Sequence, residues 1–199
     1  MLSYQSDWRI IALQKQYRKL TQSYDLQGPV WIGDSYYQFE QESLFDDKLI
    51  IYLPTQFMDL PEAAAREKYP SVSRSQIIKT NEDMTVNFTF SYLGENESPL
   101  TPEALWAEIE RLFPSSVLYD TGTLKKENLE VFWLEYKSFS VEDEVYNILF
   151  PIVIGGADLI IGAFNCPITQ YDIWKPCVLQ IIMTMQTRQD EEDHHNERL

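Results

Sequence analysis

Apolar and polar residues alternate most clearly between positions 85 and 92, a period-two pattern typical of a strand with one buried face. The apolar residues that should face the core are Val86, Phe88, Phe90 and Tyr92. The polar residues that should face water are Thr85, Asn87, Thr89 and Ser91. One covered and one wet face favours an antiparallel sheet. Residues 76–80 are expected to pair with this strand across a turn at 81–83.

Two further regions predict strands that pair locally. Tyr37 and Phe39 alternate with polar residues, and an alternating segment at 49–53 follows the turn candidate Asp46-Asp47, which predicts a hairpin ending near Pro54. Later in the chain, three consecutive strands are expected: 129–139, 144–154 and 158–165.

The three later strands differ in their expected positions. Residues 129–139 are apolar on both faces, which indicates a central strand covered on each side. The acidic turn Glu142-Asp143 should lead into 144–154, and Gly155-Gly156 is a two-residue hairpin signal. Pro151 lacks a backbone N–H and therefore predicts an edge or a bulge.

Four segments predict helices: 7–24, 62–69, 101–113 and a last helix beginning near Asp172. In the predicted helix 101–113, Thr101 is a good N-cap and Pro102 suits the first turn. Its inward stripe is expected to comprise Leu105, Ile109, Leu112 and Phe113. The last helix carries the strongest amphipathic stripe: Trp174, Cys177, Val178, Ile181, Ile182 and Met185.

Length and charge set the organisation and exclude several partners. The chain has 199 residues, which is about one domain. We expect a single α+β domain over 1–187, with 1–28 as an N-terminal helical extension and 188–199 as a disordered acidic tail. The formal net charge of −15 disfavours nucleic-acid binding. The same charge can also serve solubility alone.

The chain shows no signal for secretion or for a membrane. Its first residues lack a basic region followed by an apolar stretch. The most apolar segment, 150–164, is short and interrupted by glycines and Asp158, so it should not span a bilayer. Two cysteines without a secretion signal favour the cytoplasm. A monomer or homodimer is expected.

Residues that could support common chemistries are scarce or badly placed. Both histidines, His194 and His195, lie in the acidic tail, where no scaffold would position a catalytic base or a metal ligand. The chain has no glycine-rich phosphate motif. We therefore predict no catalytic residue, no metal site and no cofactor.

A carboxylate or a thiol keeps an enzymatic alternative open. Glu130 and Glu135 lie on the strand expected to be buried, where a carboxyl pKa would be raised. Glu135 could equally pair with a nearby lysine or lie at an exposed strand end. Cys166 and Cys177 are more typical of small buried residues than of nucleophiles. A perturbed group in a concave pocket would favour a small-molecule enzyme that uses carboxylates or Cys166.

Two clusters on connecting segments combine aromatic with cationic residues. The first comprises Lys68, Tyr69 and Arg74, and the second comprises Asn165, Trp174 and Lys175. Loops on a rigid scaffold often carry recognition, and Trp, Tyr and Arg are enriched at binding hot spots. We take these six residues as candidate binding residues. The structural alternative is that the prolines punctuate helices and that Trp174 lies in the core.

The order of predicted elements resembles the Mog1/PsbP-like fold, in which an antiparallel sheet is sandwiched between helices. The resemblance covers roughly residues 30–187. The segments Lys68-Tyr69-Pro70-Ser71, Asn87-Phe88-Thr89-Phe90 and Asn165-Cys166-Pro167 also resemble those of uncharacterised bacterial proteins. The fold implies a binding module, since its members include a Ran-GTPase-binding factor, photosystem subunits and bacterial adaptor chaperones. It assigns no functional residue.

The leading hypothesis from the sequence is a cytoplasmic protein-interaction module, such as an adaptor or chaperone-like accessory protein, whose partner is another protein. The small-molecule enzyme is the first alternative. The second is a self-associating structural protein that leaves the apolar stripe of the last helix partly exposed.

Overall fold

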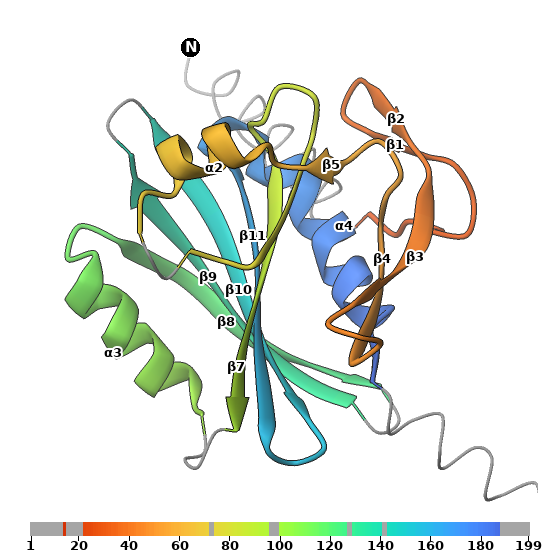
Figure 1. Cartoon of the computed structure of the whole chain (residues 1–199). Helices are drawn as coiled ribbons and strands as arrows, with labels where there is room; N and C mark the ends of the chain where they lie inside the picture. Colours follow the sequence, from red (N-terminus) through yellow and green to blue (C-terminus); the bar gives the residue numbers. More distant parts are fainter. Residues whose placement is uncertain are drawn as a thin grey trace, which may run out of the picture.

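Seven antiparallel strands form the main sheet of the computed structural model, which describes residues 14, 22–71, 74–95, 100–126, 129–140 and 143–187. Across the sheet the order is β5 (Met58–Asp59), β6 (Ile77–Thr80), β7 (Asn87–Glu95), β11 (Asp158–Pro167), β10 (Glu144–Ile154), β9 (Leu129–Phe139) and β8 (Val117–Lys126). The chain is therefore an α+β protein built mostly from antiparallel strands (Figure 1).

Two smaller sheets and three helices complete the described structure. A three-stranded sheet has the order β12 (Gln186–Thr187), β4 (Leu49–Pro54), β3 (Phe39–Leu44), and β1 (Val30–Ile32) pairs with β2 (Ser35–Tyr37). The helices are α2 (Glu62–Lys68), α3 (Pro102–Leu112) and α4 (Tyr171–Met183), the last preceded by a 3₁₀ turn at 168–170. Within these described parts no helix is long and apolar enough to cross a membrane.

The core lies where α4 packs between the main sheet and the β12–β4–β3 sheet (Figure 1). The inner face of β4 supplies Leu49, Ile51 and Leu53, all fully buried. The apolar stripe of α4 is buried along its whole length, and Trp174 packs against Phe57 and Phe164. Because the stripe is covered, it offers no surface for self-association.

Ion pairs join the β12–β4–β3 sheet to the main sheet at two places. Lys48, at the start of β4, lies 2.8 Å from Asp158 of β11, and Lys79 of β6 lies 2.8 Å from Glu42 of β3. The Lys48 ammonium and the Tyr92 hydroxyl hold the pKa of the Asp158 carboxyl below its usual range. The Lys48–Asp158 pair lies at the end of the main sheet that carries the β10–β11 turn, whereas Lys79 is in register with Phe88 and Phe164, nearer the opposite end.

The opposite face of the main sheet is covered only in part. Tyr69, which follows α2, reaches Asn165 of β11, and Trp106 of α3 packs against Tyr136 of β9. Between them, the outer residues of β10 and β11 are half-exposed: Asn147, Leu149, Ile161, Ala163 and Asn165. The expected sandwich of helices is thus present only at the two sides of this face.

The predicted hairpins are confirmed. The 39–44 and 49–54 strands pair antiparallel, β6 pairs with β7, and β10 pairs with β11. Both glycines of the β10–β11 turn have positive φ, 62° for Gly155 and 75° for Gly156, which glycine adopts without steric cost. The boundaries of β9 and β10 match the predicted ones.

Pro151 lies at a local edge inside the sheet. The pairing of β10 with β9 ends at Leu149–Leu134, whereas its pairing with β11 continues through Pro151 to Ile154. Beyond Leu149, β10 has no partner on the β9 side, so the missing N–H of Pro151 removes no ladder bond there. The edge prediction is therefore correct for this part of the strand.

Three expectations need correction. Asn87 and Thr89 were expected to face water, but they are 0% and 6% exposed, because Tyr69 and its neighbours cover this part of the outer face. The strand 129–139 is next to the sheet edge rather than central, although Trp133 and Leu134 are buried on its two faces. The edge strand β8 was not predicted.

The fourth correction concerns the inward stripe of α3. Thr101 caps the helix by accepting a hydrogen bond from the Ala104 N–H at 3.2 Å, as expected. Ile109 is buried, but Leu112 and Phe113 are 54% and 59% exposed. The helix packs against β9 through Trp106, whereas Leu112 in its last turn and Phe113 just after it stay exposed to solvent.

Two predicted segments fall largely or wholly outside the described residues. The tail 188–199 lies outside them, as do 1–13 and 15–21 of the predicted N-terminal helix. Residues 22–24, which belong to that prediction, are described and are not helical.

Candidate interaction sites

Three of the six candidate residues meet where α2 ends above β11. The Tyr69 hydroxyl accepts a hydrogen bond of 3.4 Å from the Asn165 side-chain amide. Lys68 lies 5.8 Å from the centre of the Tyr69 ring and donates to the Met84 carbonyl. Burial lowers the pKa of Lys68 and raises that of Tyr69. The structure thus brings these residues together, although they are already engaged with one another.

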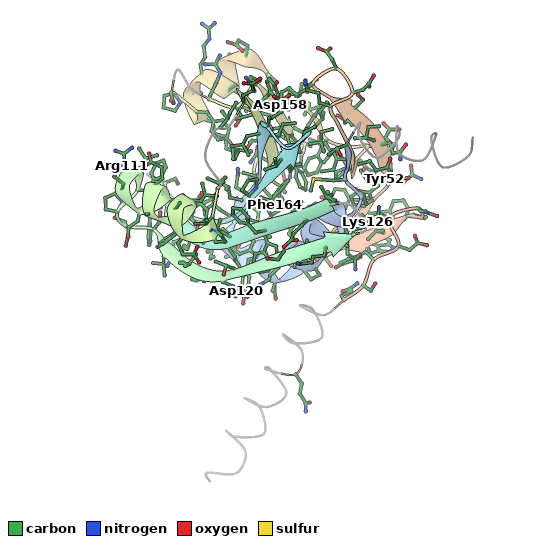
Figure 2. All side chains as sticks on the ribbon, turned by 90° about the horizontal axis from the view of Figure 1, so that it is seen from below. Tyr52, Arg111, Asp120, Lys126, Asp158 and Phe164 are labelled. Atoms are coloured by element: carbon green, nitrogen blue, oxygen red, sulfur yellow. The ribbon has the colours of Figure 1, made fainter. Side chains whose placement is uncertain are left out.

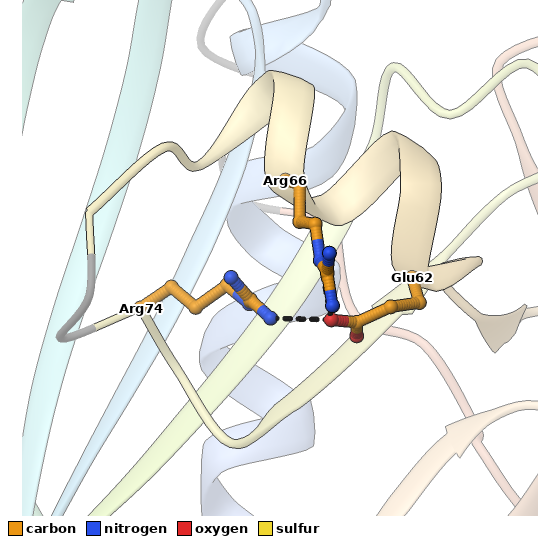
Figure 3. A network of polar contacts seen from close by, with 3 residues as sticks. All are labelled: Glu62, Arg66 and Arg74. Carbon is orange, nitrogen blue, oxygen red and sulfur yellow. Dashed lines mark hydrogen bonds and ion pairs between the residues drawn. The ribbon is translucent and has the colours of Figure 1, made fainter.

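Arg74 joins this cluster through Glu62 (Figure 3). One Glu62 carboxylate oxygen accepts hydrogen bonds from Arg66 at 2.9 Å and from Arg74 at 2.7 Å. These two guanidinium groups hold the pKa of Glu62 below its usual range. Arg74 therefore closes the segment that follows α2 onto the start of the helix, which is a structural role.

A row of asparagines crosses the sheet beneath the cluster. Asn87, Asn165 and Asn147 are in register on β7, β11 and β10, and the Asn87 amide donates to Asn165 at 2.8 Å. Asn147 donates to the Ser138 hydroxyl at 2.9 Å. The side-chain carbonyl oxygen of Asn87 is buried and has no hydrogen-bond partner among the described residues. The row fixes strand register through polar contacts rather than apolar ones.

The other two candidate residues lie on the opposite side of the sheet. Trp174 is 2% exposed, so it belongs to the core and does not contribute to a binding surface. Lys175 forms an ion pair with Glu135 of β9, lies 5.4 Å from the centre of the Trp133 ring and 4.0 Å from Asp120. Lysine and glutamate thus neutralise each other within the core, as the lysine alternative for Glu135 foresaw.

The thiols and the buried tyrosine beside this pair are not activated. Cys166 and Cys177 are free thiols, 1% and 0% exposed, and burial raises the pKa of both far above the usual range. Burial and the neighbouring Glu135 likewise raise the pKa of Tyr146. A thiol at such a pKa is protonated and a poor nucleophile at neutral pH. The geometry gives no support to an enzyme that uses Cys166.

An exposed apolar surface lies at the β8 edge of the main sheet, where the chain passes from α3 into β8. We call this the α3–β8 ridge, and it comprises Leu112, Phe113, Val117, Leu118 and Tyr119. All five side chains are more than a third exposed. Arg111 precedes the ridge on α3, and Asp120 follows it on β8 (Figure 2). The five lie within positions 112–119, although Val117 and Leu118, as consecutive strand residues, point to opposite faces of the sheet. Exposed large apolar side chains are ordinary when scattered, so their density along this short segment is what marks it as a candidate interaction site.

The ridge lies on a strand whose outer edge is open. β8 is the last strand of the main sheet, and among the described residues it pairs only with β9. The register slips between Leu118 and Asp120, so Tyr119 sits at a bulge. Within the described parts of the chain, no backbone hydrogen bond from β8 reaches another element besides β9. Open edges of this kind accept strands from other chains.

A cleft of about 420 Å³ lies close to the ridge, at the tip of the β9–β10 hairpin. Its lining residues are Phe139, Ser140, Asp143, Glu144, Pro167, Ile168 and Thr169. Glu144 is paired with Lys137 at 2.8 Å, and the Lys137 ammonium lies 4.7 Å from the centre of the Phe139 ring. Phe139 itself is 50% exposed. The cleft thus combines carboxylates with apolar side chains.

Sequence reasoning found neither the ridge nor the cleft. The run Leu112-Phe113 was assigned to the core because it continues the periodicity of α3. Val117, Leu118 and Tyr119 are three consecutive apolar residues. Such a run fits neither the strand period nor the helix period, and this irregularity is the sequence signal that marks the ridge. Among the described residues no group of three His, Cys, Asp or Glu side chains could hold a metal ion.

Comparisons with known proteins identify the fold but no family. No protein-family model matches the chain, and no curated protein matches it significantly. The solution structure of the cyanobacterial PsbP protein CyanoP from Synechocystis sp. PCC 6803 is similar at 10% identity and a TM-score of 0.57. The match covers 84% of this chain and 98% of CyanoP. At this identity the likeness shows a PsbP-like fold, as the order of predicted elements indicated.

Two further solved structures are more distant. A protein of unknown function from Pseudomonas aeruginosa has 12% identity and a TM-score of 0.43, with 75% of this chain and 97% of that one covered. The T6SS immunity protein TplEi from the same organism has 9% identity and a TM-score of 0.37, with 92% and 84% covered. Neither similarity is close enough to carry an argument.

Proposed function

We propose that this chain is a non-enzymatic protein-interaction module that binds another protein through the α3–β8 ridge. The observation that carries the proposal is the concentration of five exposed apolar side chains in positions 112–119, three of them on the open edge strand β8 and two at the end of α3. An isolated chain gains nothing from exposing them, because burying each such side chain contributes about 1.5–3 kcal/mol. A partner that covers the ridge would gain part of this free energy.

The remaining features support a binding role, for which we propose the cytoplasm as the compartment. The described residues hold a buried, neutralised Lys175–Glu135 pair and protonated thiols where an enzyme would need accessible groups. The fold shared with CyanoP is compatible with such a role, although a fold alone assigns no function. An adaptor or chaperone-like accessory protein, present as a monomer or homodimer, fits these properties best.

The test compares two matched double variants in affinity capture from cells of the organism that encodes the chain. Phe113→Ser/Val117→Ser removes two apolar side chains from the ridge. Leu93→Ser/Val153→Ser removes two that are equally exposed, 61% and 51%, at the opposite end of the sheet. We expect the wild type and the control variant to retain the same protein, and the ridge variant to lose it.

Two results would overturn the proposal. The first is equal capture of the same protein by both double variants, provided that circular dichroism shows both to be folded. The second is repeated recovery of the wild-type chain without any other protein. Light scattering on the purified chain separates this result from self-association, which would appear as a concentration-dependent mass.

A further inference from the structure

We propose that the partner's binding segment is an extended peptide that places an apolar side chain on the α3–β8 ridge and a cationic side chain, Arg or Lys, in the cleft at the β9–β10 tip. The inference rests on the proposed function and specifies the chemistry of the partner. The inference follows from three properties: the position of the cleft relative to the ridge, the charge of the cleft, and the distance between the cleft and the ridge.

Strand register connects the ridge to the cleft. Val117 of β8 is paired with Lys137 of β9, and Phe139, two residues further along β9, lines the cleft and is paired with Glu144 of β10. The far wall is formed where β11 ends, at Pro167 and Ile168. Val117, Lys137 and Phe139 lie on one face of the sheet, because they occupy paired or alternate positions. A segment that crosses the ends of β8, β9 and β10 on this face therefore passes from Val117, the ridge residue on that face, into the cleft.

The charge of the cleft selects a cation. Asp143 contributes a carboxylate for which no side-chain partner is found among the described residues, since its contacts with Ser140 use the Asp143 backbone. Glu144 is neutralised by Lys137, so the described lining of the cleft carries one net negative charge. The chain as a whole carries −15, so its field also attracts a basic segment. Phe139 and Ile168 can pack along the aliphatic part of an Arg or Lys side chain.

The distance predicts the spacing in the partner. Neighbouring strands lie about 4.8 Å apart, so the path from β8 to the cleft beyond β10 spans about 10–14 Å. An extended peptide advances about 3.3 Å per residue, so this path corresponds to about three to four residues. Side chains separated by four positions also point to the same side of an extended peptide, whereas those separated by three do not. The expected pattern is an apolar residue and an Arg or Lys at i and i+4.

The test uses synthetic fluorescein-labelled peptides in a Ser/Thr background and measures binding by fluorescence anisotropy. The first peptide carries Phe at i and Arg at i+4. The second carries Glu in place of the Arg, and the third carries the Arg at i+3. We expect the first to bind at least about tenfold more tightly than either of the others, and to weaken when salt rises from about 50 mM to about 500 mM.

Protein variants assign the two contacts. Asp143→Asn removes the free carboxylate of the cleft and should weaken the first peptide about tenfold, while Val117→Ser should weaken all three. Asp46→Asn is the matched control, because it removes one charge from the exposed turn between β3 and β4, in the other sheet. It should leave binding unchanged.

The outcomes separate this inference from the proposed function. Equal binding of the Arg and Glu peptides, or unchanged binding to Asp143→Asn, overturns the cationic contact. No binding by any of the three peptides overturns the extended segment as a whole. In each of these cases the proposed function stands if Phe113→Ser/Val117→Ser still abolishes capture of the natural partner, and it falls with the inference if capture is unaffected.

Discussion

The β10–β11 hairpin and the α3–β8 segment belong to one antiparallel region of the chain but differ in what covers them. Along β10 and β11 the inward apolar side chains, such as Ile148, Phe150 and Phe164, are buried against α4 and its neighbours. Along β8 nearly every residue is exposed, and the last turn of α3 adds two more apolar side chains to the solvent. The hairpin is thus built for stability, whereas the α3–β8 segment keeps apolar surface that the fold itself does not use.

The largest expected difference concerns two ion pairs that join β9 to its surroundings. Lys175→Met leaves Glu135, whose side chain is 4% exposed, charged and unpaired in the core, which should cost about 3–5 kcal/mol. Lys125→Met breaks the β8–β9 pair with Glu130, whose side chains are 71% and 60% exposed, and should cost less than about 0.5 kcal/mol. Urea unfolding measures both, and equal costs would contradict the comparison.

A control identifies the cause of the Lys175 effect. Lys175→Met combined with Glu135→Gln removes the buried charge together with its partner. The double variant should recover part of the lost unfolding free energy, because an unpaired charge costs more than an unpaired amide. A double variant less stable than the single one would show that the ion pair is not what Lys175 contributes.

The next difference concerns two glycines that face aromatic rings. A Cβ at Gly162 of β11 would lie 2.2 Å from the Phe150 ring, and one at Gly122 of β8 would lie 2.6 Å from the Trp133 ring. Phe150 is enclosed on all sides, whereas the edge strand β8 can shift outward. We expect Gly162→Ala to cost about 3 kcal/mol and Gly122→Ala about 1 kcal/mol in urea unfolding. The reverse order would show that β8 is held as firmly as the core.

A smaller difference should appear at alkaline pH. Burial raises the pKa of Tyr136 of β9 to about 12, above its value of about 10 in the unfolded chain. The folded state therefore keeps this proton longer, so its contribution is complete below pH 10 and is lost as the pH rises through 12. Between pH 8 and pH 12 the wild type should lose on the order of 2 kcal/mol more unfolding free energy than Tyr136→Phe. Parallel pH profiles of the two proteins would refute this.

The smallest effect is expected on the ridge. Phe113→Ser and Val117→Ser remove exposed side chains and should each change the free energy of unfolding by less than about 0.5 kcal/mol. Thermal unfolding would detect a larger change. A loss of 2 kcal/mol or more would mean that the ridge stabilises the fold and is not spare surface for a partner.

The contrast between covered and exposed segments also separates what the sequence predicts from what it does not. Buried hairpins produce local signals, such as the alternation along 49–53 and the Gly155-Gly156 turn, so their strands were predicted within a few residues. The edge strand β8 faces solvent on most sides and therefore carries no alternation that pattern reasoning could detect. Exposure at the end of α3 depends on where the sheet stops, which no local pattern contains.

The candidate residues follow the same logic. Lys68, Tyr69 and Asn165 were chosen by residue type, and the structure brings them together, yet their contacts are with one another. That Lys175 is the partner of Glu135 depends on a contact between residues 40 positions apart, which the sequence allows but does not select. Trp174 shows the limit most clearly, because the same residue type serves both cores and hot spots.

The pairing of β12 with β4 has a consequence for the order in which the chain can fold during synthesis. Gln186 pairs with Ile50, and α4 covers the inner face of β4, so this face must await residues made more than a hundred positions later. At about 5–20 residues per second, translation leaves Leu49, Ile51 and Leu53 without their native cover for several seconds or longer. The β12–β4–β3 sheet is thus completed late in synthesis. Slowed translation between β4 and α4 should lengthen the time for which the inner face of β4 is exposed to chaperones and proteases.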